Sequence, residues 1–291
     1  MKTQVITICS LGHKDVWKLT SELLPRFVEA DEYLVYVPES EITEFRSLTN
    51  SKISVRSQNE LGADYVSKLW ARVVSENNSQ RYGWYLQQFY KIEALLISDA
   101  DRLIIWDADC VPVHQIETFD SSGNPIFMVG AFEYNASYFD AIWKLLDMQK
   151  VQEFSFVIPG FPIPKAWVLE FEKTVSENNG GKEWYDAILD TTSFSLKSGF
   201  SETETLGTFI ANRYPNEWTT FEGFWERRGQ KRFGYARNFS AKKIIRVARR
   251  AGLDIVSFEN WDIRGIRLVV RRLKEKLTSL KLKRVINDSN R

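Results

Sequence analysis

Two carboxylates one residue apart, Asp107 and Asp109, follow the apolar run Leu103–Trp106. Such a run is typical of a strand buried on both faces, and open α/β folds bind ligands at the carboxyl ends of such strands. Carboxylate oxygens there suit Mg²⁺ or Mn²⁺, which complete their coordination with water and substrate phosphates. We predict that both aspartates, on the same side if strand geometry continues, bind a divalent metal and a diphosphate. A solvated acidic turn is the simpler alternative.

A second group of polar residues lies earlier in the chain, in the aromatic segment 81–91. Gln87 and Lys91 are four residues apart and share one face of a helix, with Gln88 beside them. Their amide and ammonium groups could contact the base or phosphate of a nucleotide. The alternative is that the aromatic residues form core and these polar groups cover its rim.

A third group lies in the segment 198–208. Ser201 and Glu204 have the spacing of a capping box, so we expect Glu204 to reach back to the start of a helix. Glu202 is not needed for that box. It is the better candidate for a catalytic carboxylate or an acceptor-binding group, because a general base must lie within hydrogen-bonding reach of the attacking hydroxyl.

Alternating strand and helix patterns would position these groups. In the first half we expect strands at 5–9, 33–37, 52–56 and 103–106, and helices at 17–30, 40–48, 63–76 and 85–98. This alternation predicts βαβ units and a mainly parallel sheet of the doubly wound α/β class. In the second half we expect a strand at 126–130 and helices at 138–148, 167–176, 182–189 and 205–213. The prolines of segment 154–164 predict a loop.

Taken in order, Gly83–Lys91, Asp107–Asp109 and Ser201–Gly207 resemble a bacterial family related to GT-A-fold glycosyltransferases. The resemblance covers roughly residues 1–215. It implies a GT-A-like, Rossmann-like α/β fold with a mainly parallel sheet flanked by helices. It also implies a metal-dependent glycosyltransferase, which moves a sugar from a nucleotide-diphosphate donor to a glycan or lipid-linked acceptor.

The resemblance assigns roles to residues. Asp107 and Asp109 would bind Mn²⁺ or Mg²⁺ and the donor diphosphate, and Glu202 would face the acceptor. The donor pocket for the nucleotide-sugar would be lined by Ser10, Gln87, Gln88 and Lys91. Two features depart from the pattern: segment 157–162 contains no histidine, and the chain has only His13 and His114, so no late histidine can serve as a third metal ligand.

Two other functions compete with this one. The motif at Asp107 also resembles the nucleophile motif of haloacid-dehalogenase-like phosphatases. In that family the motif follows the first core strand, whereas here a long α/β pattern precedes it and no convincing late acidic pair follows. A non-catalytic sugar-binding protein would use exposed aromatic residues, for which the candidates are Trp218, Phe221, Phe224 and Trp225.

The net charge of +1 over 291 residues is the sum of two unlike parts. Residues 264–291 carry ten basic and two acidic side chains, a net +8, which leaves −7 for residues 1–263. Apolar residues recur in this tail at helical spacing, so we predict a basic amphipathic C-terminal helix, with a catalytic domain at 1–245 and an extension at 246–291. The residues expected to contact an anionic membrane or a partner are Arg267, Arg271, Arg272 and Lys274.

Packing of that helix on the acidic domain, or on a second copy in a homodimer, is the alternative, and we do not expect nucleic acid. With 44% apolar and 14% aromatic residues the chain can form a full core, which excludes disordered and collagen-like classes. No apolar run approaches the roughly 20 residues of a membrane span, and the N-terminus lacks a signal-peptide pattern. We therefore predict a cytoplasmic protein, peripheral at the inner face of the membrane if the tail binds lipid. Cys9 and Cys110 are predicted to be buried thiols.

Overall fold

The computed structural model describes residues 1–62, 64–130 and 133–259. Its centre is a five-stranded sheet with the strand order β3-β2-β1-β4-β7, and all neighbours are parallel except β7, which is antiparallel to β4. The strands are β1 (Thr3–Ile8), β2 (Glu32–Val37), β3 (Ile53–Ser57), β4 (Arg102–Trp106) and β7 (Gly160–Pro164). The structure therefore confirms the predicted α/β class with a mainly parallel sheet.

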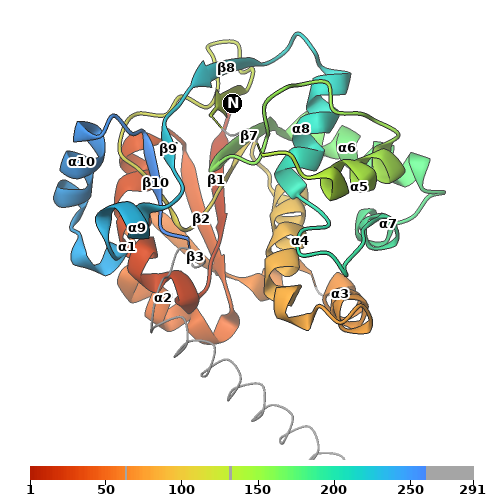
Figure 1. Cartoon of the computed structure of the whole chain (residues 1–291), viewed down its shortest axis with the longest axis horizontal. Coiled ribbons are helices and arrows are strands. Elements are labelled where there is room, and N and C mark those ends of the chain that lie inside the picture. The colour runs from red at the N-terminus through yellow and green to blue at the C-terminus, as the bar shows by residue number, and fades with distance from the viewer. Residues whose placement is uncertain (63, 131–132, 260–291) are drawn as a thin grey trace, which may run out of the picture.

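Helices cover both faces of this sheet (Figure 1). Alternate strand residues point to opposite faces, so Ile6 and Ile105 pack with one set of helices, whereas Val5 and Ile104 pack with the other. The first face is covered by α3 (Asp64–Ser75), α4 (Tyr82–Ile97), α5 (Ala136–Leu146), α6 (Lys165–Asn178), α7 (Trp184–Thr191) and α8 (Glu202–Arg213). The second face is covered by α1 (Lys14–Phe27) and α2 (Ile42–Leu48).

The strand order creates a topological switch point between β1 and β4. The chain runs from β1 outward to β2 and β3, and then returns to place β4 on the other side of β1. In open α/β sheets the crevice for a ligand lies outside the carboxyl ends of the two strands at such a point. The residues that follow Ile8 and Trp106 therefore flank this crevice.

Segment 154–164 was predicted to be a loop, and this prediction is wrong for its second half. Residues Gly160–Pro164 form β7, which pairs with β4 over its whole length. Prolines are tolerated because β7 is the last strand of the sheet, where a missing N–H on the outer side removes no hydrogen bond between strands. Gly160 is required there, because a Cβ would lie 2.5 Å from the Trp106 ring.

Smaller elements complete the second half of the chain. A short sheet joins β5 (Cys110–Pro112), β10 (Ile255–Ser257) and β9 (Trp225–Glu226), and a second joins β6 (Ile126–Val129) and β8 (Thr219–Glu222). The remaining helices are α9 (Gly229–Phe233) and α10 (Ala241–Arg250), and the boundary predicted after residue 245 falls inside α10. The predicted basic helix of the tail lies outside the described residues. Within the described ranges, no helix combines the length and apolarity needed to span a membrane.

Candidate functional site

The two aspartates of the motif lie in a tight turn directly after β4. Strand geometry ends at Trp106, and the amide of Cys110 donates to the Asp107 carbonyl at 3.1 Å, so the turn replaces the strand-like alternation expected for Asp107 and Asp109. Both side chains are half-buried. The turn stands at the carboxyl end of β4, beside the switch point.

Three different elements hold the backbone of this turn. The Thr20 hydroxyl of α1 donates to the Ala108 carbonyl at 2.9 Å, and the Asp107 amide donates to the Pro159 carbonyl at 3.0 Å. The amide of Phe258, just after β10, donates to the Asp109 carbonyl at 3.0 Å. A turn fixed from three sides presents its carboxylates in a defined arrangement, as a binding site requires.

Lys91 joins the turn to helix α8. Its ammonium donates to Asp107 Oδ1 at 2.7 Å and to Glu202 Oε1 at 2.6 Å. Burial lowers the pKa of Lys91, but Asp107 and Glu202 together raise it by more. The pKa therefore lies above its usual value, and the ammonium stays charged. The side chains of Lys91 and Glu202 are 6% and 7% exposed, whereas that of Asp107 is 37% exposed. Asp107 is therefore the most exposed member of this triad.

Gln88 fixes the start of α8 against α4. Its side-chain oxygen accepts from the Glu202 amide at 3.1 Å, and the residue is 2% exposed. This bond satisfies one of the amides that a helix leaves without a partner in its first turn. Gln87 is half-buried on the same helix and makes no hydrogen bond to Asp107 or Glu202 in the part of the chain that the structure describes.

Only half of the predicted capping box forms at the start of α8. The Ser201 hydroxyl accepts from the Glu204 amide at 3.3 Å, as expected. The Glu204 carboxylate does not reach back, and it accepts instead from the Ser155 hydroxyl at 2.7 Å and the Phe156 amide at 2.9 Å. Lys150 completes this cluster at 3.0 Å. Glu204 therefore ties the loop before β7 to α8, because the buried Ser155 hydroxyl and Phe156 amide need an acceptor and take its carboxylate.

The loop after β1 lies at the same edge of the sheet as the turn, because β1 and β4 are adjacent and parallel. Ser10 is half-buried there, and His13 follows in a short 3₁₀ helix, Leu11–His13. Burial and the Asp107 carboxylate raise the pKa of Asp109, and the nearby His13 opposes them. The structure thus brings Ser10 to the same edge of the sheet as the aspartates.

Three charged residues near the turn were missed by the sequence interpretation. Arg227 pairs with Glu133 at 2.8 Å and with Glu259 at 3.3 Å. The pKa of Glu259 is raised to about 7, mainly by burial and also by Asp109 and Asp107, whereas Arg227 lowers it. Glu259 is therefore close enough to sense both aspartates. No local pattern marks these residues, because the ion pairs join segments far apart in the chain.

The donor set of the turn suits a metal that is completed by its substrate. Among the described residues, no group of three or more His, Cys, Asp or Glu side chains is placed to hold a metal ion. Two carboxylates with a half-exposed outer face are enough for Mg²⁺ or Mn²⁺, which keep water and bind phosphate oxygens. Asp107 and Asp109 therefore fit such a metal, whereas an all-protein cage is not formed by the described residues.

The four aromatic residues proposed for a sugar-binding protein do not form one exposed face. Trp218, Phe221 and Trp225 pack against the hydrophobic core, whereas Phe224 is 62% exposed. The membrane-contact candidates Arg267, Arg271, Arg272 and Lys274 lie outside the described residues.

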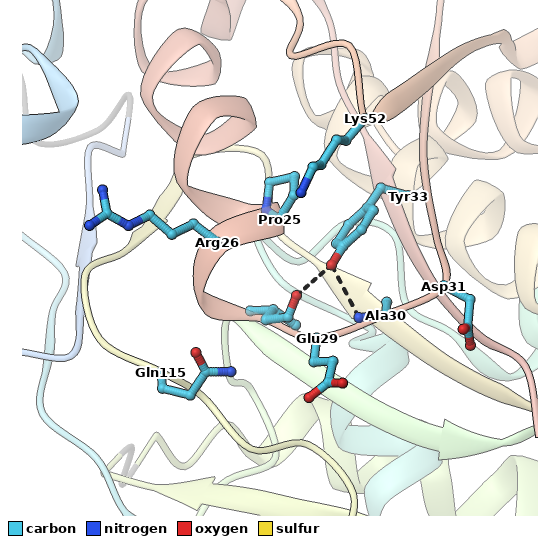
Figure 2. Close-up of a pocket in the computed structure, with 9 residues that line it drawn as sticks. Pro25, Arg26, Glu29, Ala30, Asp31, Tyr33, Lys52 and Gln115 are labelled. Carbon is cyan, nitrogen blue, oxygen red and sulfur yellow. Dashed lines mark hydrogen bonds between the residues drawn. The ribbon is translucent and has the colours of Figure 1, made fainter.

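Figure 2 shows a pocket of about 550 Å³ beside the start of β2. Asp107 and Asp109 follow the carboxyl end of β4 and do not line it. Its wall includes the end of α1, the start of β2 and Lys52, which precedes β3. Tyr33 donates to the Val28 carbonyl at 2.6 Å and accepts from the Ala30 amide at 3.1 Å. Its hydroxyl is thus already used in fixing the connection between α1 and β2, and the pocket contains none of the predicted site residues.

Comparisons with known proteins place this site within a sequence family. The sequence model of a family of unknown function, DUF6492, matches residues 18–225, a range that contains the turn, Lys91 and α8. No curated protein is similar enough in sequence to count as a match. Among solved structures, mouse xyloside xylosyltransferase 1 in its apo form is similar with a TM-score of 0.46 and 12% identity, over 91% of this chain and 100% of that chain. Because the family match spans well over half of the chain, the protein belongs to the DUF6492 family.

Proposed function

We propose that the protein is a metal-dependent glycosyltransferase, which moves a sugar from a nucleotide-diphosphate donor to a glycan or lipid-linked acceptor. The observation that carries the proposal is the turn of Asp107 and Asp109 at the carboxyl end of β4, beside the switch point and held from three sides. This is where an open α/β sheet binds its ligand.

The negative charge of residues 1–263 supports a donor whose diphosphate is held through a cation. Residues 1–263 have a net charge of −7, and the cation nearest to the aspartates, Lys91, is enclosed between two carboxylates. An anionic diphosphate therefore needs an added positive charge at this edge. Asp107 and Asp109 would hold Mn²⁺ or Mg²⁺, which when bound neutralises the charge that develops on a departing diphosphate.

The chain's own groups would orient the donor around this metal. Ser10 and Gln87 are half-buried and can present polar groups to a nucleotide-sugar. Gln88 and Lys91, which were also predicted to line the donor pocket, are 2% and 5% exposed. Their burial supports a role in holding the protein groups that face the donor.

Glu202 remains the candidate catalytic carboxylate. Lys91 holds it close to Asp107, so it belongs to the same centre as the proposed metal site. A carboxylate in this place can accept the proton of an acceptor hydroxyl or stabilise positive charge at the sugar.

The basic tail supports a membrane-borne acceptor. Residues 264–291 have a net charge of +8, and each basic side chain near an anionic surface contributes about 1 kcal/mol to binding. We propose that Arg267, Arg271, Arg272 and Lys274 bring the enzyme to such a surface. Flotation with anionic liposomes at low salt tests this, and protein that stays at the bottom of the gradient contradicts it.

A panel of nucleotide-sugars with Mn²⁺ tests the main proposal. We expect release of the nucleoside diphosphate from one donor class, and loss of release when the metal is chelated. Phosphate release from simple phosphomonoesters, without any requirement for a nucleotide, would instead indicate a phosphatase. Sugar binding with no release from any donor would indicate a binding protein.

A further inference from the structure

Lys91 separates two carboxylates that differ in their access to solvent. Its ammonium contacts both Asp107 and Glu202 within 2.7 Å, and it lies on the buried side of Asp107. A ligand that enters from the crevice meets the half-exposed carboxylate first. The Lys91 ammonium therefore contacts Asp107 on its buried side, opposite the face that a ligand approaches.

The charges of this group explain why both partners are needed. Asp107, Asp109 and Glu202 carry three negative charges, and Lys91 carries one positive charge. If Glu202 were neutral, the whole charge of Lys91 would fall on Asp107 and offset the attraction of the two aspartates for a cation. With Glu202 ionised, Lys91 is balanced on its buried side and can hold Asp107 in place without cancelling it.

We propose that Lys91 and Glu202 form a positioning pair that sets the affinity of Asp107 and Asp109 for a divalent cation. Lys91 fixes the orientation of Asp107, and Glu202 offsets the charge of Lys91. This inference rests on the metal-dependent function proposed above, but it is independent of whether Glu202 also contacts an acceptor. Residues next to metal ligands commonly orient and tune them through such hydrogen bonds.

The pair Lys150–Glu204 offers a matched control on the same helix. Its two side chains are 3.0 Å apart, with Lys150 15% exposed and Glu204 1% exposed. Its other partners are the Ser155 hydroxyl and the Phe156 amide, and it makes no hydrogen bond to Asp107 within the described residues. Glu204→Gln thus removes a buried charge of the same kind, two residues away, without changing the charge beside Asp107.

The test is Mn²⁺ binding to the full-length chain without nucleotide, measured by electron paramagnetic resonance or calorimetry. We expect Glu202→Gln to raise the Kd on the order of tenfold, because Lys91 then offsets Asp107. Adding Lys91→Met to Glu202→Gln should return the Kd to within about threefold of the wild-type value, because the unbalanced charge is removed. Glu204→Gln should change it by less than about twofold, and thermal denaturation confirms that each variant is folded.

The rescue distinguishes an unbalanced charge on Lys91 from packing damage, and the remaining difference of up to about threefold measures the orientation of Asp107 that Lys91 provides. The double variant replaces a buried ion pair with neutral side chains of similar size, a change that folded proteins commonly tolerate. If Lys91 contributed only packing, or contacted the metal-bound ligand directly, the second substitution would weaken binding further. Mn²⁺ binding to the double variant that is as weak as in Glu202→Gln, or an unchanged Kd in Glu202→Gln, overturns the inference.

The same experiment separates this inference from the proposed function. If the wild-type chain binds no Mn²⁺ alone, the same variants are compared for Mn²⁺ binding in the presence of a nucleoside diphosphate, whose phosphates complete the coordination of the metal. If it binds no Mn²⁺ with any nucleoside diphosphate, the metal-dependent function and the positioning pair both fail. If the wild type binds Mn²⁺ and the double variant shows no rescue, only the positioning pair fails.

Discussion

Helix α8 carries two acidic residues in its first turn, Glu202 and Glu204, which serve two different regions of the molecule. Both are buried and both pair with a lysine. Glu202 connects through Lys91 to Asp107, which is half-exposed at the edge of the sheet. Glu204 connects only to the loop before β7 in the described contacts. Burial and ion pairing alone therefore do not mark a functional carboxylate. What distinguishes Glu202 from Glu204 is that its lysine, Lys91, also contacts Asp107.

Gly207 belongs to the Glu204 side of the helix. It lies three residues beyond Glu204, on the same face, and a Cβ at this position would lie 2.0 Å from the Phe156 ring. The short motif that contains these residues thus combines two functions. Glu202 pairs with Lys91 of the candidate site, whereas Glu204 and Gly207 contact Ser155 and Phe156 in the loop before β7.

The largest effect is expected from Asp109→Asn, in the region that Glu202 serves. This substitution removes one of the two proposed metal ligands. We expect turnover of the donor to fall at least a thousandfold, equivalent to about 4 kcal/mol, because the remaining carboxylate cannot hold the metal and diphosphate alone. Donor turnover with saturating Mn²⁺ measures this. Thermal denaturation should show an intact fold, and near-normal turnover would remove Asp109 from the site.

A somewhat smaller effect is expected from Glu202→Gln. At saturating Mn²⁺ we expect turnover to fall at least a hundredfold, equivalent to about 2.7 kcal/mol, because the amide of glutamine can neither accept a proton nor stabilise positive charge. Glu204→Gln, assayed at a temperature where it is folded, is the control and should turn over donor at nearly the wild-type rate. An equal loss of turnover in Glu202→Gln and Glu204→Gln would contradict the different roles assigned to these two residues.

Gly207→Ala tests the other side of the comparison through stability. The added methyl group meets the Phe156 ring, and we expect the free energy of unfolding to fall by about 2 kcal/mol. Chemical denaturation measures this change. Turnover per folded molecule should stay close to that of the wild type, so a variant with unchanged stability but lost turnover would place Phe156 or its loop in the reaction.

The smallest effect is expected from Gln88→Leu, which removes the acceptor for the Glu202 amide. An unsatisfied buried amide at the start of α8 should lower the free energy of unfolding by about 1 kcal/mol. Urea unfolding followed by circular dichroism detects a change of this size. A loss of donor binding with unchanged stability would instead support the direct donor contact first predicted for Gln88.

The sequence predicts the parts of the site that depend on local patterns. The strands at β1 and β4 follow from apolar runs, and the carboxyl-edge position of Asp107 follows from the run that precedes it. Ser10 reaches the same edge because β1 and β4 are adjacent. These inferences need only the period of the pattern and the rule that ligands bind at the carboxyl ends of parallel strands.

The sequence does not predict which charges pair across the fold. Lys91 and Glu202 are 111 residues apart, and Arg227 and Glu133 are 94 apart. Glu204 matches a capping box, but the donors of Ser155 and Phe156, which are brought to it only by folding, take its carboxylate. Pro162 and Pro164 argue against a strand until β7 is known to be the last strand of the sheet, where missing amides cost nothing between strands.

Calorimetric titration of nucleoside diphosphates into the wild-type chain, with and without Mn²⁺, tests the central claim most directly. The acidic edge at Asp107 and Asp109 should bind one of these diphosphates only when the metal is present, because its nearest cation is already enclosed by carboxylates. Asp109→Asn should abolish that binding. Equal binding with and without Mn²⁺, or no binding of any nucleoside diphosphate in its presence, would contradict a metal-dependent nucleotide-sugar site at this edge.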